Sequence, residues 1–452
     1  MPTHIEQEQF YQISLDLVSA IETEDLEEFQ EILDELSPVD IAHLIESSPD
    51  KRRKELWQHL GDDLQGDVIN HLGDDLQNYF LSRMSTKQIL ETAQDLESDD
   101  VADMLQLLPE KNRNRVLFSM EPEDRREVEE LLAYHEDTAG GLMNPEVITV
   151  RAGVTLDVVL RYLRRQQDLP DRFESVFVVN RSDKLVGILH LSDLITQEPE
   201  TTVREIMDSD VEGIPAEMPD TEVALLFQRH DYLSAPVVDH TGKLLGRITV
   251  DDVVDVIREE VDHTVMSLAG LDEDADTFAT VAKSVRSRAI WLGLNLITAF
   301  VAALVILEFE DAIAVITALA VLNPVVASMG GVAGSQTLTL VIRALAMGQL
   351  NSSNFYWFLA RELGVGVING LLWAVVTGGV AYLLFQNWQL SLVSGAAILL
   401  NITVAKCTGA ILPMVLKTMK IDPALSGSVI LTTVTDAVGF FTLLGLATWY
   451  ML

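Results

Sequence analysis

The sequence predicts a multidomain protein with an α-superhelical N-terminal domain, a central α+β module and an all-α transmembrane domain of five helices. Short amphipathic segments repeat over the first 135 residues, and a strand-and-helix pattern repeats from about residue 143. Apolar runs long enough to cross a bilayer follow residue 288. We expect domain boundaries at 1–135, 136–257, 258–288 and 289–452, the third range being a connecting helix.

The parts of the chain before and after residue 288 differ strongly in charge. Of the 69 acidic and 31 basic residues, only six and five lie after it, which leaves 63 acidic and 26 basic residues before it. A net charge near −37 repels nucleic acid and anionic lipid, and bound divalent cations would relieve its self-repulsion. Acidic surfaces also simply aid solubility. The charge therefore suggests a cation sensor and excludes a nucleic-acid partner.

Some classes of protein are disfavoured by what the sequence lacks. One cysteine, Cys407, excludes a disulfide framework and a thiolate metal site within one chain. The first residues, MPTHIEQEQFYQ, have no basic region followed by an apolar core, so we expect no secretory signal and a soluble part that stays in the cytoplasm. The sequence contains no P-loop, nucleophile motif or dense His or Cys cluster, so we do not expect an enzyme.

The N-terminal domain contains an internal repeat. LSPVDIAHLIESSPDKRRKELWQHL, from Leu36, aligns without gaps on LESDDVADMLQLLPEKNRNRVLFSM, from Leu96. Between them GDDLQGDVINHL is followed by GDDLQNYFLSRM. Apolar residues at three- and four-residue spacing predict short amphipathic helices. Helix-pair repeats of this kind stack into a small superhelix.

The central module consists of two copies of one pattern. VFVVNRSDKLVGILHLSDLI, from Val176, matches APVVDHTGKLLGRITVDDVV, from Ala235, so two βαββα units lie in tandem. Ser182-Asp183 and Thr241-Gly242 stand where the hairpins need turn residues. This module resembles a pair of CBS domains, which form one compact two-fold module that senses a ligand.

The rest of the chain leads into and through the membrane. A long helix after Asp252 runs through the acidic stretch LDEDAD towards the apolar runs, and Lys283, Arg286 and Arg288 place the start of the first run in the cytoplasm. Basic loops fall on the side of the soluble part, and an odd number of spans puts the C-terminus outside. The five spans are expected at about 289–307, 312–332, 355–385, 390–416 and 424–451.

A carboxylate, Asp436, lies in the middle of the last expected span. It costs several kcal/mol there unless it faces water, a cation or a partner. The alternative to a functional role is a proton-neutralised or lysine-paired contact between helices. Threonines at 432, 433 and 435 supply oxygens and close packing around it. Such a helix is suited to line a narrow polar pore.

A glycine-rich stretch in the second span is the other informative feature. Asn323-Pro324 is followed by GGVAGSQ at 330–336. Proline and clustered glycines break or loosen a helix, and bare carbonyls at membrane depth are tolerated where they line a cavity. The alternative is a simple kink with small-residue packing. These residues alone leave both interpretations open.

The order of the parts, together with these motifs, resembles the MgtE family of magnesium channels over nearly the whole chain. The matching motifs are YHEDTAGGLM at 134–143, the CBS pair, the connecting helix, GGVAGSQ with IRALA, and DPALSGSVILTTVTD at 422–436. The resemblance implies a homodimer in the cell inner membrane that moves Mg²⁺ into the cytoplasm through a pore on the dimer axis. Asp436 of each subunit would hold hydrated Mg²⁺, an ion that dehydrates reluctantly. Thr432 would contribute backbone oxygen, and Asp422 would lie near the cytoplasmic mouth.

The resemblance also implies that cytoplasmic Mg²⁺ closes the pore by binding between the helical domain, the CBS pair and the connecting helix. The matching positions are Asp99, Asp103, Gly141, Asp220, Glu222, Asp231, Asp252, Asp255 and Glu260. Asp252 also suits a simple helix N-cap. Where the family commonly has acidic residues this chain has His263 and Thr264, and where it usually has Asn this chain has Val332. Part of the gating set and one pore contact therefore differ.

A nucleotide is a further ligand to consider. CBS pairs often bind adenine nucleotides such as ATP through a Thr or Ser and an Asp three residues later. Thr249 and Asp252 fit this spacing, whereas the first copy has His190 with Asp193. We therefore expect any nucleotide at the second copy.

Two alternatives to the magnesium channel remain open. One is a transporter of another divalent ion such as Co²⁺, including a proton-coupled carrier that uses Asp436 and Lys406 as a relay. The other is a sensor whose membrane part only anchors the CBS pair. Lys406, inside the fourth span, would snorkel or pair with Asp436 or Glu362. We expect it off the pore axis, because a cation in the path would oppose Mg²⁺.

Overall fold

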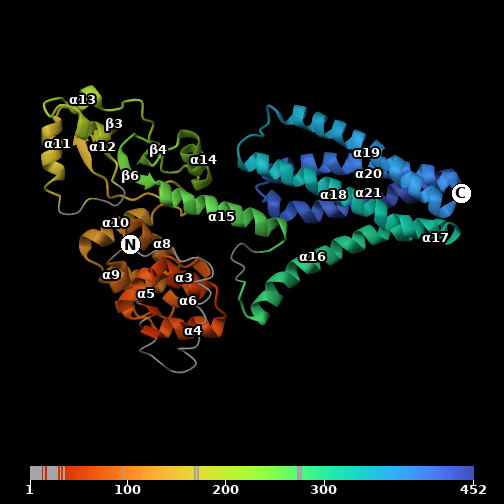
Figure 1. The fold of residues 1–452 in the computed structure, drawn as a ribbon, viewed down its shortest axis with the longest axis horizontal. Helices are drawn as coiled ribbons and strands as arrows, with labels where there is room; N and C mark the ends of the chain where they lie inside the picture. Colours follow the sequence, from red (N-terminus) through yellow and green to blue (C-terminus); the bar gives the residue numbers. More distant parts are fainter. Residues whose placement is uncertain are drawn as a thin grey trace. The chain divides into compact units, whose positions relative to one another are not determined.

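The computed structural model describes residues 36–94, 96–166, 173–271 and 277–452, with isolated positions at 13, 16–17, 29–30, 32–33 and 169. The stretch MPTHIEQEQFYQ and most of LDEDAD lie outside these ranges. The chain divides into two compact units (Figure 1). The first, soluble unit comprises Met1–Glu260 with Asp276–Thr280, and the second, membrane unit comprises Val261–Ala275 with Val281–Leu452.

Short helices form the beginning of the soluble unit, as the repeat predicts. Ser37 begins one of them in a capping box with Asp40, and apolar faces meet in one core that includes Ile45, Ile69 and Leu105. The two repeat copies give equivalent pairs, α3–α4 and α8–α9. The helices are α3 Pro38–Glu46, α4 Asp50–His59, α5 Asp62–Ile69, α6 Asp74–Leu81, α7 Thr86–Ala93, α8 Ser98–Gln106, α9 Glu110–Ser119 and α10 Pro122–Leu131.

The CBS pair forms two three-stranded sheets of the same topology, with order β1-β2-β3 and β4-β5-β6. In each sheet the first two strands are parallel and the last two form an antiparallel hairpin at the predicted turn. The predicted βαββα repeat is confirmed. Its elements are β1 Thr149–Arg151, α11 Leu156–Leu163, β2 Ser175–Val179, β3 Leu185–His190, α12 Leu191–Thr196, α13 Val203–Ile206, β4 Ile214–Pro215, α14 Asp220–His230, β5 Ser234–Val238 and β6 Leu244–Thr249.

The range expected as a connecting helix, 258–288, belongs to two helices. α15, Val250–Leu268, begins at the end of the second CBS copy, and α16, Val281–Glu308, already starts within this range. Gly270 follows α15 with a φ of 69°, a left-handed conformation that favours glycine and ends a helix.

Five helices in the described part of the membrane unit are long and apolar enough to span a bilayer, as predicted. They are α16, α18 Ala318–Ala346, α19 Phe355–Phe385, α20 Trp388–Thr418 and α21 Pro423–Met451, and the short α17, Glu310–Val315, precedes α18. The second span was expected to end at residue 332, but α18 continues for four more turns. The prediction ended the span too early because hydropathy depends on residue type alone. It cannot show that polar residues face a cavity rather than lipid, as Ser335, Gln336 and Arg343 do.

Close packing of small residues joins the membrane helices. α20 packs against α18, α19 and α21, while α16 packs mainly on α21. A Cβ on Gly409 would lie 2.5 Å from the carbonyl oxygen of Gly334, so glycine allows α18 and α20 to touch there. α18 is one helix through Pro324 and the glycine cluster. Of the two interpretations left open by the sequence, the structure therefore favours small-residue packing at Gly334, because α18 is not broken there.

Candidate cation sites

A cavity of about 800 Å³ lies along α18 and α21 in the membrane unit. Its α18 residues recur every three or four positions, which is the spacing of one helix face. Asp436 is the one carboxylate among the lining residues, and Thr432 lies one turn before it. The cavity is lined by Ala327, Ser328, Gly331, Val332, Ser335, Gln336, Thr339, Leu340, Arg343, Thr432 and Asp436.

The carboxylate of Asp436 has no hydrogen-bond or ion-pair partner among the described side chains, and the residue is only partly exposed. The alternative of a lysine-paired contact is wrong, because Lys406 pairs with Glu362 instead. The hydroxyl of Thr435 is buried and donates to the Thr432 carbonyl oxygen at 3.0 Å, so that carbonyl already accepts one bond. The arrangement leaves the Asp436 carboxylate without a direct partner in a mainly apolar cavity that also carries hydroxyls, an amide and the Arg343 guanidinium.

Asp422 is separate from Asp436. It caps the N-terminus of α21, where its two oxygens accept hydrogen bonds from the amides of Ala424 at 2.9 Å and Leu425 at 3.0 Å. Fourteen residues along α21 correspond to about 21 Å of helix. His263 Nε2 lies 3.7 Å from Asp422 Oδ2. The histidine that replaces a commonly acidic residue of α15 therefore contacts the carboxylate that caps α21. Asp422 does not line the cavity.

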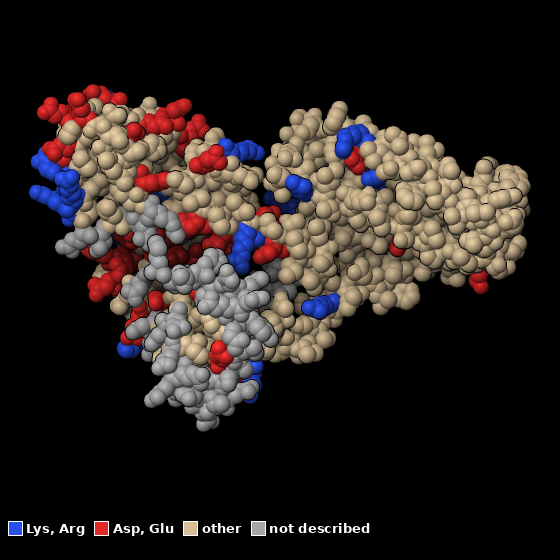
Figure 2. All heavy atoms as spheres, viewed as in Figure 1, with Lys and Arg blue, Asp and Glu red and all other residues tan. Residues whose placement is uncertain are grey.

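Carboxylates gather at α8 and the start of α15 in the soluble unit. Asp99 is only 8% exposed. Burial, with repulsion from the carboxylates of Asp252, Asp100 and Glu97, raises the pKa of Asp99 to about 8. Burial and repulsion from Asp100 and Asp252 likewise raise the pKa of Asp103 to about 7. Figure 2 shows Asp and Glu gathered over the soluble unit, while the visible surface of the membrane unit carries only scattered charged side chains.

Three members of this group were not predicted from the sequence. Glu97 and Asp100 add negative charge beside Asp99. Asn144, only 1% exposed, donates from Nδ2 to Glu97 Oε2 and, at 3.4 Å, to Asp99 Oδ1. The acidic run around Asp99 and the position of Asn144 directly after YHEDTAGGLM were the available signals, but the contact itself joins residues 45 or more apart.

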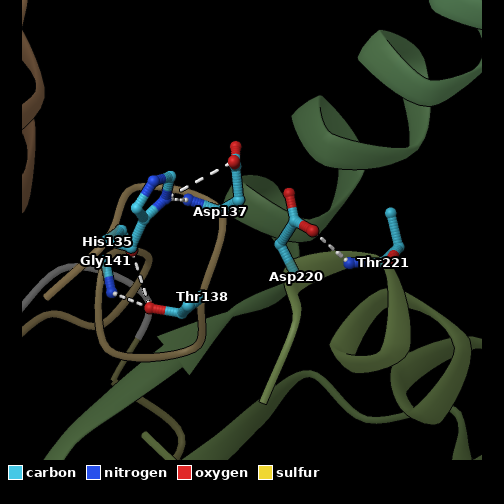
Figure 3. Close-up of polar contacts among 6 residues, drawn as sticks. All are labelled: His135, Asp137, Thr138, Gly141, Asp220 and Thr221. Carbon is cyan, nitrogen blue, oxygen red and sulfur yellow. Dashed lines mark hydrogen bonds and ion pairs between the residues drawn. The ribbon is translucent and has the colours of Figure 1, made fainter. Parts of the chain in front are cut away.

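A second group lies around the loop at 135–141 (Figure 3). The amide of Asp220 donates to the Asp137 carbonyl oxygen at 3.2 Å. Burial, with repulsion from Asp137, raises the pKa of Asp220 despite its bond from the Thr221 amide. Gly141 closes the loop by donating from its amide to the Thr138 carbonyl oxygen at 2.9 Å. Two predicted positions, Gly141 and Asp220, therefore lie on facing segments.

Gly141→Ala is expected to lower the free energy of unfolding by about 2 kcal/mol, because a Cβ there would lie 2.6 Å from the carbonyl oxygens of His135 and Glu136. Gly153→Ala is the matched control, since no atom lies within 4 Å of its Cβ position. Denaturant unfolding of the full-length protein measures both variants. Equal stability of the two would contradict the tight loop.

The remaining predicted regulatory positions are dispersed. Asp231 ends α14 with a φ of 54°, eleven residues after Asp220, and Glu222 lies in the first turn of that helix. Asp255 and Glu260 follow Asp252 along α15. Among the described residues no group of three or more His, Cys, Asp or Glu could by itself hold a metal ion. The structure thus forms two acidic groups rather than one site.

The expected nucleotide pair is in contact. Thr249 Oγ1 donates to Asp252 Oδ2 at 2.8 Å, and the Thr249 amide donates to the same oxygen at 3.3 Å. Asp252 is the third residue of α15 and therefore not the N-cap that the alternative interpretation expected. Its carboxylate instead accepts hydrogen bonds from Thr249, the residue directly before the helix.

Three protein-family models match this chain, and they cover most of it. The model of the MgtE divalent cation transporter matches residues 323–446, that of the MgtE intracellular N domain matches 36–137, and the CBS domain model matches 139–199 and 203–259. The magnesium transporter MgtE of Thermus thermophilus is 32% identical over 96% of this chain and 98% of its own length. That of Bacillus subtilis is 29% identical over 94% of each chain.

Two solved structures are similar to part of this chain. The cytosolic domain of the Mg²⁺ channel MgtE in complex with ATP is 35% identical, with a TM-score of 0.49, over 54% of this chain and 99% of its own. The soluble part of a magnesium transporter is 26% identical, with a TM-score of 0.47, over 56% of this chain and 99% of its own. From the full-length match to the Thermus thermophilus relative, the chain belongs to the MgtE family of magnesium transporters.

Proposed function

We propose that this protein moves Mg²⁺ selectively into the cytoplasm along the cavity between α18 and α21. The observation that carries the proposal is the unpaired carboxylate of Asp436 in a membrane cavity whose other polar groups are hydroxyls, an amide and the Arg343 guanidinium. Mg²⁺ keeps several waters when proteins bind it, so a single carboxylate near the hydroxyls of Ser335, Thr339 and Thr432 suits the hydrated ion better than a dense cage of ligands.

The path is completed by a second copy of the chain. One carboxylate balances only half the charge of Mg²⁺, and a two-fold axis along the cavity would supply Asp436 twice. The polar face of α18 also needs cover within a bilayer, where exposed polar groups are costly. A homodimer with the cavity at its axis meets both requirements.

In this proposal the end of the membrane unit that carries the basic residues faces the cytoplasm. Arg343, Arg361, Lys417 and Lys420 lie where α18 ends, α19 begins and α20 ends, which is one side of the bilayer. Leu268 of α15 packs at that same end, beside Leu338, Ile342 and Ala424. An odd number of spans then puts the C-terminus outside.

Cytoplasmic Mg²⁺ closes the path by binding at the acidic groups of the soluble unit. The raised pKa values of Asp99, Asp103 and Asp252 mean that these carboxylates ionise at a cost, which a divalent cation would remove. Gly141, Asp220, Glu222, Asp231, Asp255 and Glu260 complete the set of positions proposed to respond to the ion.

Purified protein in vesicles that contain a Mg²⁺-sensitive dye tests the proposed function. We expect Mg²⁺ influx that excess Co²⁺ reduces only weakly, and influx that Mg²⁺ on the cytoplasmic side suppresses. Preferential Co²⁺ influx would favour a transporter of another divalent ion. No flux of either ion would favour a membrane-anchored sensor.

We also propose that the second CBS copy binds an adenine nucleotide. The observation that favours it is the contact of Thr249 with Asp252, which presents a hydroxyl and a carboxylate side by side. Thr249→Val is expected to weaken ATP binding about fivefold by removing one hydrogen bond, while Mg²⁺ flux without ATP stays unchanged. Equilibrium binding of ATP to the full-length protein measures this, and unchanged affinity would contradict the assignment.

A further inference from the structure

A buried polar network joins α18, α19 and α20 outside the cavity. Lys406 Nζ donates to Thr337 Oγ1 at 3.1 Å, and Thr337 Oγ1 donates to Glu362 Oε2 at 3.0 Å. Nζ also lies 3.6 Å from the same carboxylate oxygen. Thr337, Glu362 and Lys406 are 1%, 3% and 5% exposed, and none of them lines the cavity.

Small residues make room for this network. The contact of Gly409 with Gly334 brings α20 against α18 one turn from Thr337. Gly366, one turn after Glu362, lets α19 approach α20 beside the stem of Lys406, since a Cβ there would lie 3.3 Å from the Thr403 Cα. The long lysine side chain therefore lies between the helices instead of reaching towards the bilayer surface.

The carboxylate of Glu362 is fully engaged. Its Oε2 takes the contacts to Thr337 and Lys406, and its Oε1 accepts a bond from Arg361 Nη1 at 2.8 Å. Arg361 is about half exposed, so one cation is buried and the other reaches outward. Two cations with one carboxylate leave the group positively charged, which suits its place away from a cation path.

Stability alone does not explain such a network. Apolar side chains of similar volume would fill the same space without removing charges from water, and such replacements are often neutral or stabilising. The network adds a directional constraint. Hydrogen bonds fix the rotation of a helix about its axis and its position along that axis, whereas apolar contacts allow a helix to slide. Thr337 is its only member on α18.

The opposite face of α18 is the one that matters for the ion. Ser335, Gln336 and Thr339 flank Thr337 in sequence and line the cavity with Asp436. A rotation of α18 by about 20° would move side-chain atoms about 5 Å from the axis by about 2 Å. That displacement is large compared with the tolerance of a hydrogen bond to a hydrated ion.

We propose that Thr337, Glu362 and Lys406 are positioning residues for the ion path. Through the Thr337 hydroxyl, the Lys406–Glu362 pair holds the cavity face of α18 at the rotation and depth that fit hydrated Mg²⁺. This inference rests on the proposed function, because it concerns the fit of the same path to its ion. Loosening α18 is therefore expected to lower discrimination between ions of different size.

Two substitutions of one residue separate hydrogen bonding from packing. Thr337→Val keeps the shape and removes the hydroxyl, while Thr337→Ser keeps the hydroxyl and removes a methyl group. In vesicles we expect Thr337→Val to lower the ratio of Mg²⁺ to Ca²⁺ flux about fivefold, the equivalent of one hydrogen bond, and Thr337→Ser to stay near wild type. An unchanged flux ratio in Thr337→Val, or a larger change of the ratio in Thr337→Ser than in Thr337→Val, would overturn the positioning role.

A second variant covers the case in which Thr337→Val does not fold. Lys406→Met combined with Glu362→Met removes both buried charges and leaves apolar side chains of similar volume. We expect this double variant to unfold at a higher temperature than either single variant and to show the same lowered ratio of Mg²⁺ to Ca²⁺ flux. A wild-type ratio in the folded double variant would overturn the inference. Absence of Mg²⁺ flux in the wild-type protein would instead overturn the proposed function, and the inference with it.

Discussion

Asp436→Ala is expected to reduce Mg²⁺ uptake by about tenfold or more. The carboxylate is the one negative charge among the residues that line the membrane cavity, and it has no partner among the described side chains. Losing a charged hydrogen-bonding group costs about 1.5 to 3 kcal/mol per subunit, which corresponds to about a tenfold to hundredfold loss of ion binding. Two copies in a dimer would add to this loss.

Uptake by a strain deficient in Mg²⁺ transport measures the effect, with wild-type and variant protein at equal abundance in the membrane. Asp311→Asn is the control, because Asp311 is an exposed carboxylate of the membrane unit that does not line this cavity. We expect the control to retain uptake. Equal uptake by wild type and Asp436→Ala would exclude Asp436 from the ion path, and no uptake by either would favour another ion.

The fold could be predicted largely because its signals are local. Helix periodicity, the alternation of strands and the length of apolar runs each depend on neighbours in sequence, and the internal repeats present each signal twice. The end of α18 was missed for the same reason. Gln336 and Arg343 are polar, and only the tertiary arrangement shows that they continue a helix along a cavity.

The sites were predictable only in part. Asp436 stood out because a lone carboxylate in an apolar span is costly wherever it points. The partner of Lys406 could not be chosen from the sequence, since Asp436 and Glu362 are both within reach of a lysine until the packing of α19 on α20 is known. Asn144 was missed because an amide near a loop has no pattern of its own, and its role arises from a contact across the soluble unit.

The stability of the soluble unit without Mg²⁺ is expected to fall as the pH rises from 6 to 9. Asp99 and Asp103 have folded-state pKa values of about 8 and about 7, above the ordinary 3.8. The folded state therefore binds protons more tightly than the unfolded chain, and the resulting stabilisation is lost as the pH rises through those values. Over this range we expect a loss of about 4 kcal/mol in the free energy of unfolding.

Saturating Mg²⁺ is expected to remove most of this loss, because the cation replaces the protons at the same carboxylates. A ligand at a hundred times its dissociation constant adds about 2.7 kcal/mol. Asp99→Asn with Asp103→Asn should flatten the pH profile and abolish the Mg²⁺ effect. Asp239→Asn is the matched control, since hydrogen bonds from Thr241 and the Lys243 amide lower the pKa of Asp239 to about 2.

Denaturant unfolding of the full-length protein in detergent, followed by far-ultraviolet circular dichroism, measures these profiles with and without Mg²⁺. The control should keep the wild-type slope, because Asp239 stays ionised throughout the range. If the free energy of unfolding without Mg²⁺ stayed constant or rose between pH 6 and 9, the carboxylates of α8 would not be buried close enough to repel one another. Mg²⁺ would then have no repulsion to relieve at this place, and its control of the ion path would have to act through the group at Asp220 and Gly141.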